Sequence, residues 1–80
     1  MSKDFAIVPN PSSSLIEIIM KDAQFNKVSI STIDGKVVDE KQMERTYKTQ
    51  MDVSRYANGI YIINVTAEDG KLYTKKLIKN

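Results

Sequence analysis

Residues 28–38 have the sequence VSISTIDGKVV, in which Val28 and Ile30 alternate with serines. A period of two places the apolar side chains on one face of an extended strand and the polar ones on the other. Asp34-Gly35 follows, and an Asp-Gly pair between two such runs is a strong hairpin signal, because glycine adopts positive φ at little cost. The stretch therefore predicts two antiparallel strands joined by a tight turn.

The same arrangement recurs later in the chain, where Asp69-Gly70 separates Ile60–Glu68 from Lys71–Lys79. It predicts a second hairpin on the same grounds. Residues 60–65 are apolar at almost every position, which is typical of a strand covered on both faces. We therefore expect this strand in the middle of a sheet, with both of its faces buried.

Two runs nearer the N-terminus also favour strands. Phe5–Val8 is followed by Pro9 and Pro11, and proline cannot donate to a ladder, so the sheet must release the chain there. Leu15–Met20 is rich in β-branched residues, which suit a strand.

The middle of the chain is harder to assign. Tyr47–Met51 is a weaker strand candidate, and it follows the polar stretch Asp39–Thr46. Good helix formers make a helix over Lys41–Tyr47 the rival interpretation, but no capping pattern precedes an apolar stripe there. We expect a loop or the edge of a strand.

Together these runs predict an all-β fold, an immunoglobulin-like two-sheet antiparallel sandwich of about seven short strands. A chain of 80 residues suits one domain. We assign residues 4–80 to the sandwich and residues 1–3 to a disordered linker or to residues added for expression.

Tyr61 follows Gly59 by two positions, at the start of the expected central strand. Gly59 suits a backbone of positive φ just before that strand. A tyrosine in this place is typical of the tyrosine corner of Greek-key sandwiches. In that motif the tyrosine hydroxyl forms a hydrogen bond with the main chain a few residues upstream. We predict one hydrogen bond from the Tyr61 hydroxyl to main chain within Asp52–Asn58.

The composition excludes most enzyme chemistry. The chain has no histidine and no cysteine, which removes the commonest general base, the thiol nucleophile and the usual zinc ligands. No glycine-rich phosphate loop is present. A calcium site needs about six to eight oxygen ligands, and the acidic residues do not cluster at a spacing that would supply them. We expect no enzyme, no catalytic residue, no cofactor and no metal.

Charge is distributed unevenly along the chain. Residues 71–80 contain four lysines and no acid, whereas the whole chain has a formal net charge of +2. A basic segment of this kind either engages a partner or protects an edge strand from aggregation. We expect no nucleic-acid partner, because the overall charge is low and Tyr73 is the sole aromatic among these lysines.

Four motifs, in order, resemble a known family. They are Pro9-Asn10-Pro11, the hairpin Ile33–Val38, the segment Asp52–Tyr61 with its Asp-Val-Ser and Gly-Ile-Tyr, and the closing strand Gly70–Lys79. In this order they resemble the type A C-terminal sorting domain of the bacterial type IX (Por) secretion system, from about residue 5 to residue 79. Tyr56 departs from that pattern, in which a leucine is more usual.

The resemblance implies a secretion signal at the C-terminus of a larger protein of the Bacteroidetes group. Such cargo passes through the periplasm and then reaches the cell surface or is secreted. The implied partners are the translocon of the outer membrane and a sortase-like enzyme that removes the domain; a small-molecule substrate is not implied.

We expect partner recognition at the closing strand, through Lys75, Lys76, Leu77 and Lys79. A second set of residues is expected to determine the fold: Pro9, Asn10, Pro11, Asp34, Gly35, Gly59, Tyr61 and Gly70. An exposed edge strand would also permit a strand-exchanged homodimer.

The alternative is a structural or carbohydrate-binding accessory sandwich. Sugar binding would need an exposed strip of aromatic side chains. The chain has no tryptophan, and its aromatic residues are Phe5, Phe25, Tyr47, Tyr56, Tyr61 and Tyr73.

Overall fold

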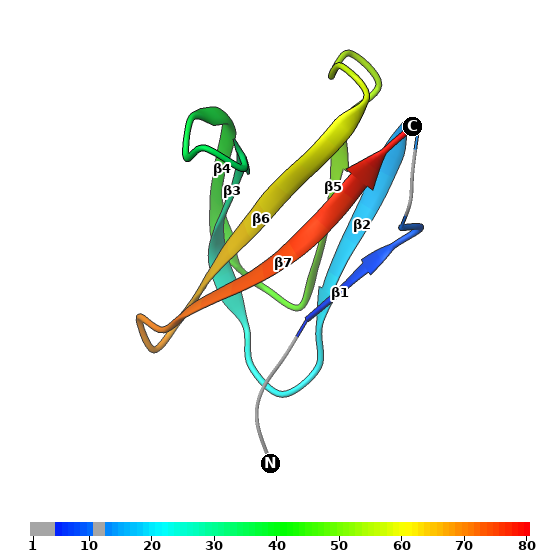
Figure 1. Cartoon of the computed structure of the whole chain (residues 1–80). Helices are drawn as coiled ribbons and strands as arrows, with labels where there is room; N and C mark the ends of the chain where they lie inside the picture. The colour runs from blue at the N-terminus through cyan, green and yellow to red at the C-terminus, as the bar shows by residue number, and fades with distance from the viewer. Residues whose placement is uncertain (1–4, 11–12) are drawn as a thin grey trace.

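The computed structural model describes residues 5–10 and 13–80, and in these ranges the chain forms seven strands and no helix. The strands are β1 (Phe5–Val8), β2 (Leu15–Met20), β3 (Phe25–Thr32), β4 (Val37–Thr46), β5 (Lys48–Asp52), β6 (Gly59–Ala67) and β7 (Leu72–Lys79). They make two antiparallel sheets, ordered β1-β2-β5 and β4-β3-β6-β7. The predicted all-β sandwich is confirmed (Figure 1).

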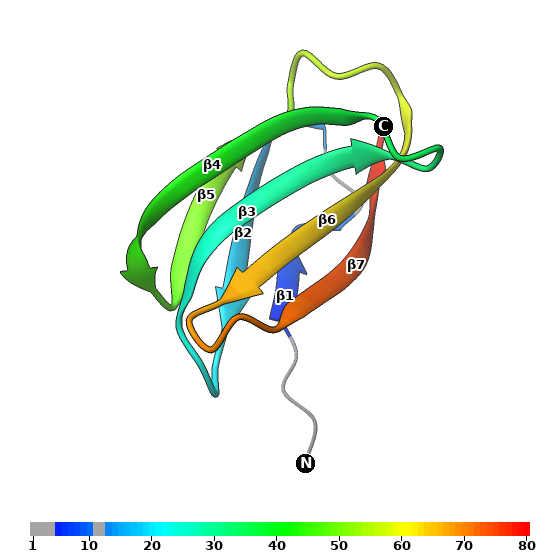
Figure 2. The same cartoon turned by 90° about the vertical axis from the view of Figure 1, so that its left-hand side faces the viewer.

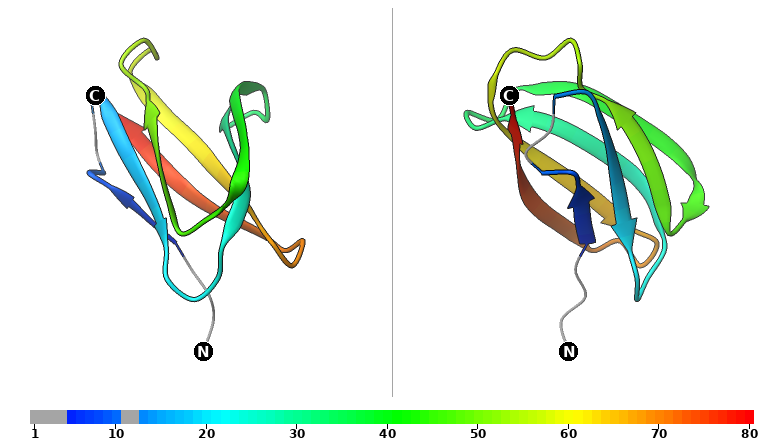
Figure 3. Two further views of the ribbon diagram at one scale, coloured as in Figure 1. Left: turned by 180° about the vertical axis from the view of Figure 1, so that it is seen from behind. Right: turned by 90° about the vertical axis from the view of Figure 1, so that its right-hand side faces the viewer.

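The two sheets lie face to face, with the smaller sheet behind the larger one in Figure 2. The strand order is immunoglobulin-like with one difference. In constant-type immunoglobulin domains the fourth strand belongs to the same sheet as the first, second and fifth strands, whereas here β4 lies beside β3 in the other sheet. β1 lies at the same side of the sandwich as β7, and β5 at the same side as β4 (Figure 3).

A single apolar core fills the space between the sheets. Both sheets contribute fully buried side chains, among them Ile16, Ile18, Phe25, Ile30 and Ile63. Burial of this kind is the main favourable contribution to folding. A domain of 80 residues is only marginally stable, so its folding depends on the burial of each of these side chains.

Both predicted hairpins are present. β3 and β4 are joined through Gly35, and β6 and β7 through Gly70, with φ angles of 95° and 87°. A hydrogen bond from the glycine amide closes each turn. Gly35 donates to the Thr32 carbonyl at 3.0 Å, and Gly70 donates to the Ala67 carbonyl at 2.9 Å. The turns need glycine because other residues rarely adopt such φ angles.

The prediction of loop or strand edge for Lys41–Tyr47 was right in its second part only. Residues 41–46 belong to β4, which pairs with β3 from Val37 to Thr46, so the loop and the rival helix were both wrong. β4 is an edge strand whose side chains are nearly all exposed, and only Met43 packs on the core. Such a strand lacks the alternation of apolar and polar residues that marks a half-buried one.

The prediction for β6 was half right. β6 lies inside the larger sheet, between β3 and β7. Only one of its faces is buried, however, because Tyr61, Ile63, Val65 and Ala67 point into the core while the alternate residues form part of the outer face. An antiparallel sheet can keep one face in water, so an apolar run does not require cover on both sides.

Two expectations fall outside the described residues. They are the boundary between residues 3 and 4, and the role of Pro11. In the described part of the chain, no helical segment is long and apolar enough to cross a membrane.

Candidate recognition surface

β7 is an edge strand, so one side of its backbone has no strand partner. Its register with β6 pairs Leu77 with Tyr61 and Ile78 with Ile60. The Ile78 amide points away from β6, since it donates to a side chain on the other side. Because these directions alternate along a strand, the main-chain groups of Leu72, Thr74, Lys76 and Ile78 face the open edge.

Asn10 covers one half of that edge. Its Nδ2 donates to the Lys76 carbonyl at 2.9 Å, and its Oδ1 accepts from the Ile78 amide at 3.0 Å. The side-chain amide thus presents a donor and an acceptor, as a neighbouring strand would. This gives a physical role to the Asn10 of the first motif, which was predicted to determine the fold.

Lys75 joins β7 to the other sheet. Its ammonium group donates to the main-chain carbonyl of Phe5 in β1 at 2.9 Å and lies 5.8 Å from the centroid of the Phe5 ring. β1 and β7 are edge strands of different sheets, so this contact closes one open side of the sandwich.

Leu77 and Lys79 are buried. Leu77 is 0% exposed and belongs to the core, and Lys79 is 6% exposed. The Lys79 ammonium group donates to the main-chain carbonyl of Tyr56 at 3.1 Å. Since a buried ammonium group needs such a partner, Lys79 anchors the segment before β6 against β7.

Tyr56 and Tyr61 form the corner beside this anchor. The Tyr61 hydroxyl donates to the Ala57 carbonyl at 2.7 Å, which confirms the predicted tyrosine corner. The two rings lie 5.2 Å apart, and the Tyr56 hydroxyl donates to the Asp39 carboxylate at 3.0 Å. Burial of the phenol, and then the bond to Asp39, raise the pKa of Tyr56 above its usual value.

Two further turns depend on aspartate side chains. Asp34 accepts from the Thr32 hydroxyl, and this bond lowers the pKa of the Asp34 carboxyl. Asp52 accepts from the amide of Ser54 at 2.9 Å, and its contacts with Ser54 lower the pKa of that carboxyl. Gly59 begins β6 with a φ of 151°, a positive value that favours glycine.

On the opposite side of the sandwich, sequence reasoning missed a lysine with a structural role. Lys41 on β4 donates to the Thr49 hydroxyl at 2.9 Å and to the Gln50 carbonyl at 3.1 Å, both on β5. It bridges the sheets as Lys75 does at the other side. Its partners lie eight and nine positions later in the sequence. The sequence did not show that the chain passes from one sheet to the other between Lys41 and these partners.

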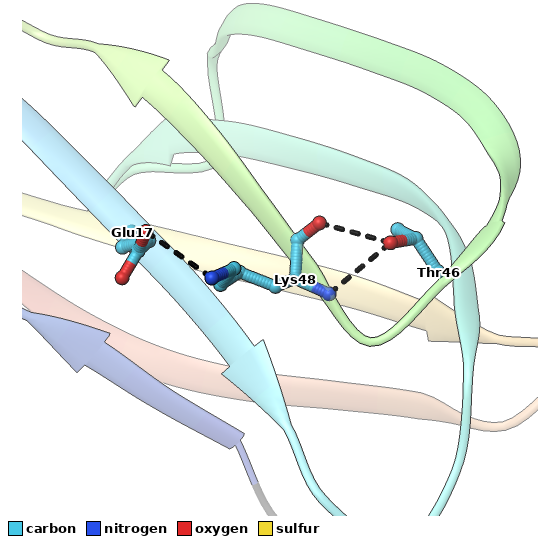
Figure 4. A network of polar contacts seen from close by, with 3 residues as sticks. All are labelled: Glu17, Thr46 and Lys48. Atoms are coloured by element: carbon cyan, nitrogen blue, oxygen red, sulfur yellow. Dashed lines mark hydrogen bonds and ion pairs between the residues drawn. The ribbon is translucent and has the colours of Figure 1, made fainter.

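A smaller polar network holds the turn from β4 to β5. The Thr46 hydroxyl donates to the Lys48 carbonyl at 3.0 Å and accepts from the Lys48 amide at 3.3 Å (Figure 4). The Lys48 ammonium group lies 3.9 Å from Glu17 on β2. An exposed ion pair of this kind contributes little to stability, so the turn depends mainly on Thr46.

The predicted recognition residues therefore differ in accessibility. Lys76 is exposed, Lys75 is half-buried and bound, and Leu77 and Lys79 are inside the sandwich. In the folded domain, Lys76 alone of the four offers its side chain freely to a partner. The recognition role of the set stays a prediction.

The aromatic side chains do not form a strip. Phe5, Phe25 and Tyr61 are buried, and Tyr56 and Tyr73 pack partly against the core. Tyr47 is exposed but stands apart, in the turn between β4 and β5. The arrangement gives no support to a sugar-binding platform.

The fold is similar to that of a solved structure, CopC from Methylosinus trichosporium OB3b. The TM-score is 0.58 with 20% sequence identity, and the match covers 95% of this chain and 89% of that one. At this identity the likeness establishes the fold alone.

A curated relative carries a similar segment. The chain is 32% identical over 74 residues to the ulvan lyase NLR42 of Nonlabens ulvanivorans, which covers 92% of this chain and 14% of the lyase. The chain thus spans about one seventh of that relative's length.

The family comparison covers nearly the whole sandwich. The family model described as "Secretion system C-terminal sorting domain" matches residues 6–80, a range that runs from β1 through β7 and includes the corner and both hairpins. The chain belongs to this family, the C-terminal sorting domains of the type IX secretion system.

Proposed function

We propose that the outer-membrane translocon of the type IX system recognises this domain as a folded sandwich and that a sortase-like enzyme then cleaves it from its cargo. Family membership establishes the sorting signal itself. Sorting tails of this family lie at the C-terminus of a larger protein that reaches the cell surface or is released. The observation that carries the proposal is that the family match spans the whole sandwich rather than a short linear stretch.

The domain acts as a signal and not as a catalyst. The relative is a lyase, and the matching segment is a small part of it. The absence of histidine and cysteine from the sequence supports a tail that leaves the chemistry to the cargo. The identity of the cargo is a separate matter, since a sorting tail does not specify it.

We place the recognition surface on β7, in the half of its edge that Asn10 leaves open. Leu72 and Thr74 direct main-chain groups to that side, where an extended segment of a partner could add as a further strand. Lys76 follows on the same strand and would contribute to orientation and association rate. The corner around Tyr61 keeps β6 and β7 in place.

The same open edge would permit a strand-exchanged homodimer, which stays a prediction. Size-exclusion chromatography with light scattering tests it directly. A second, slowly exchanging species of twice the monomer mass is the expected sign of exchange.

The proposal is tested with a reporter that has a Sec signal peptide and carries residues 1–80 at its C-terminus. We expect the reporter outside the outer membrane in a host with the type IX system, and in the periplasm when the chain is omitted. The mass of the released reporter tests the sortase step, since cleavage removes the tail. A reporter that stays in the periplasm with the tail attached would contradict the proposal.

A further inference from the structure

The outer face of the larger sheet has one apolar end. Its side chains, hereafter the apolar end, are Val37, Ile60, Ile62 and Ile78. Ile60 lies directly opposite Ile78 in the register of β6 and β7, and Ser31 of β3 lies opposite both Ile62 and Val37. Ile60 and Ile78 are 44% and 43% exposed, and Val37 is 55% exposed.

The middle of this face is polar and internally bonded. The Asn64 side-chain nitrogen donates to the Ser31 hydroxyl at 3.5 Å, and the Thr74 hydroxyl donates to the Asn64 side-chain oxygen at 3.1 Å. Beyond them Lys27 pairs with Glu40 at 3.3 Å. Polar side chains therefore separate the apolar end from Leu72, which is exposed at the other end of the face.

Lys76 lies beside the apolar end, opposite Ile62. Its ammonium group makes no hydrogen bond or ion pair with any residue of 5–10 or 13–80 that the structure shows. The acids of the neighbouring hairpin bond to other groups: Asp34 accepts from the Thr32 hydroxyl, and Asp39 accepts from the Tyr56 hydroxyl. Within the described part of the domain, the Lys76 ammonium group thus has no carboxylate in direct contact.

We propose that the apolar end and Lys76 together bind an apolar surface that carries a carboxylate, on a protein of the export machinery. The inference rests on the proposed function and names the chemistry of its partner. Burial of the four side chains would drive association, and the carboxylate would pair with Lys76 and fix orientation. Lys76 is the cation of this surface because Lys75 and Lys79 bind main-chain carbonyls of their own domain.

A second copy of the chain fits this surface less well. In a two-fold dimer the same patch lies on both sides of the interface. Two Lys76 ammonium groups would then share one apolar interface without an acid, and like charges repel most strongly where water is excluded. An acidic partner removes that penalty.

The test uses the exported reporter fusion with single substitutions. Lys76→Glu reverses the charge, and Ile78→Thr removes apolar surface while keeping a β-branched residue in the strand. Tyr47→Thr is the control, because Tyr47 is 53% exposed in the turn between β4 and β5, and β4 is the edge strand opposite β7. We expect K76E and I78T to reduce the released reporter by about tenfold and Y47T to stay within about twofold of the unsubstituted chain.

Thermal unfolding of the purified 80-residue variants verifies that each remains folded. If K76E and I78T export as well as Y47T while the unsubstituted tail is exported, the inference is overturned and the proposed function stands. If the unsubstituted tail leaves its reporter in the periplasm, the proposed function fails first. If the purified chain is a dimer that I78T converts to a monomer, a second copy occupies the apolar end and the inference is also overturned.

Discussion

The side-chain oxygen of Asn10 accepts a hydrogen bond from the main-chain amide of Ile78 at 3.0 Å, across 68 positions of sequence. Together with its bond to the Lys76 carbonyl, this contact gives the edge strand β7 a substitute partner where no strand is present. The first and last motifs of the family thus meet at one point of the fold.

Asn10→Ala should expose the amide of Ile78. Its hydrogen exchange is expected to accelerate by at least about tenfold, toward the rate of the Thr74 amide, which faces the uncovered half of the edge. The Leu77 amide faces β6 and serves as the internal control, because its protection should not change locally. Unchanged protection at Ile78 would show that Asn10 does not cover the edge in solution.

Lys79→Met should lower the free energy of unfolding by about 1–2 kcal/mol. The substitution keeps an apolar chain of similar length but leaves the Tyr56 carbonyl without its donor. Urea denaturation measures the change. Lys76→Met is the matched control on the same strand and should stay within about 0.5 kcal/mol, since its side chain is exposed. Equal effects at the two positions would contradict a structural role for Lys79.

Tyr61→Phe should cost about 0.5–1.5 kcal/mol, the net contribution of one hydrogen bond. The substitution removes the donor to the Ala57 carbonyl and leaves the packing of the ring in place. Denaturant unfolding at neutral pH is sufficient to measure it. A variant as stable as the original chain would mean that water replaces the hydroxyl at no cost.

Stability should fall in alkaline solution in a way that depends on Tyr56. Its pKa is raised in the folded state, so folding favours the protonated phenol. The resulting stabilisation is complete below the unfolded pKa of about 10 and is lost as pH rises above it. Comparing the original chain with Tyr56→Phe isolates this contribution from the lysines. We expect the difference in unfolding free energy between the two to shrink above about pH 10.

In acidic solution, stability should depend on pH in the opposite direction, through Asp52. The pKa of Asp52 is lowered in the folded state, so its contribution is present above the unfolded pKa of about 3.9 and is lost as pH falls below it. Asp52→Asn removes the titrating group at the same turn. The unfolding free energy of that variant should therefore depend less on pH between about 5 and 2 than that of the original chain.

Local signals predicted much of this fold. The Asp34-Gly35 and Asp69-Gly70 turns depend on residues adjacent in sequence, and the Tyr61 hydroxyl reaches a carbonyl four positions away. These features could be predicted because their partners lie close along the chain. The length of β4 beyond Val38 could not be predicted, since the side chains of an exposed edge strand do not alternate between apolar and polar.

The candidate site was only partly predictable for a related reason. The last strand was identified, but the sequence alone did not tell us that Lys76 is exposed and Lys79 is buried. The partners of the lysines in β7 depend on how segments far apart in sequence pack together. Lys79 binds a residue 23 positions away, and Lys75 binds one 70 positions away.

The central claim is that the signal is a folded sandwich and not a linear peptide. The most direct measurement is the amount of reporter outside the outer membrane when the tail carries Ile30→Asp, which places a charge in the middle of the core. The account predicts that export falls to the level seen with no tail, although every exposed residue of β7 is unchanged. Export of this unfolded tail at the original level would contradict it.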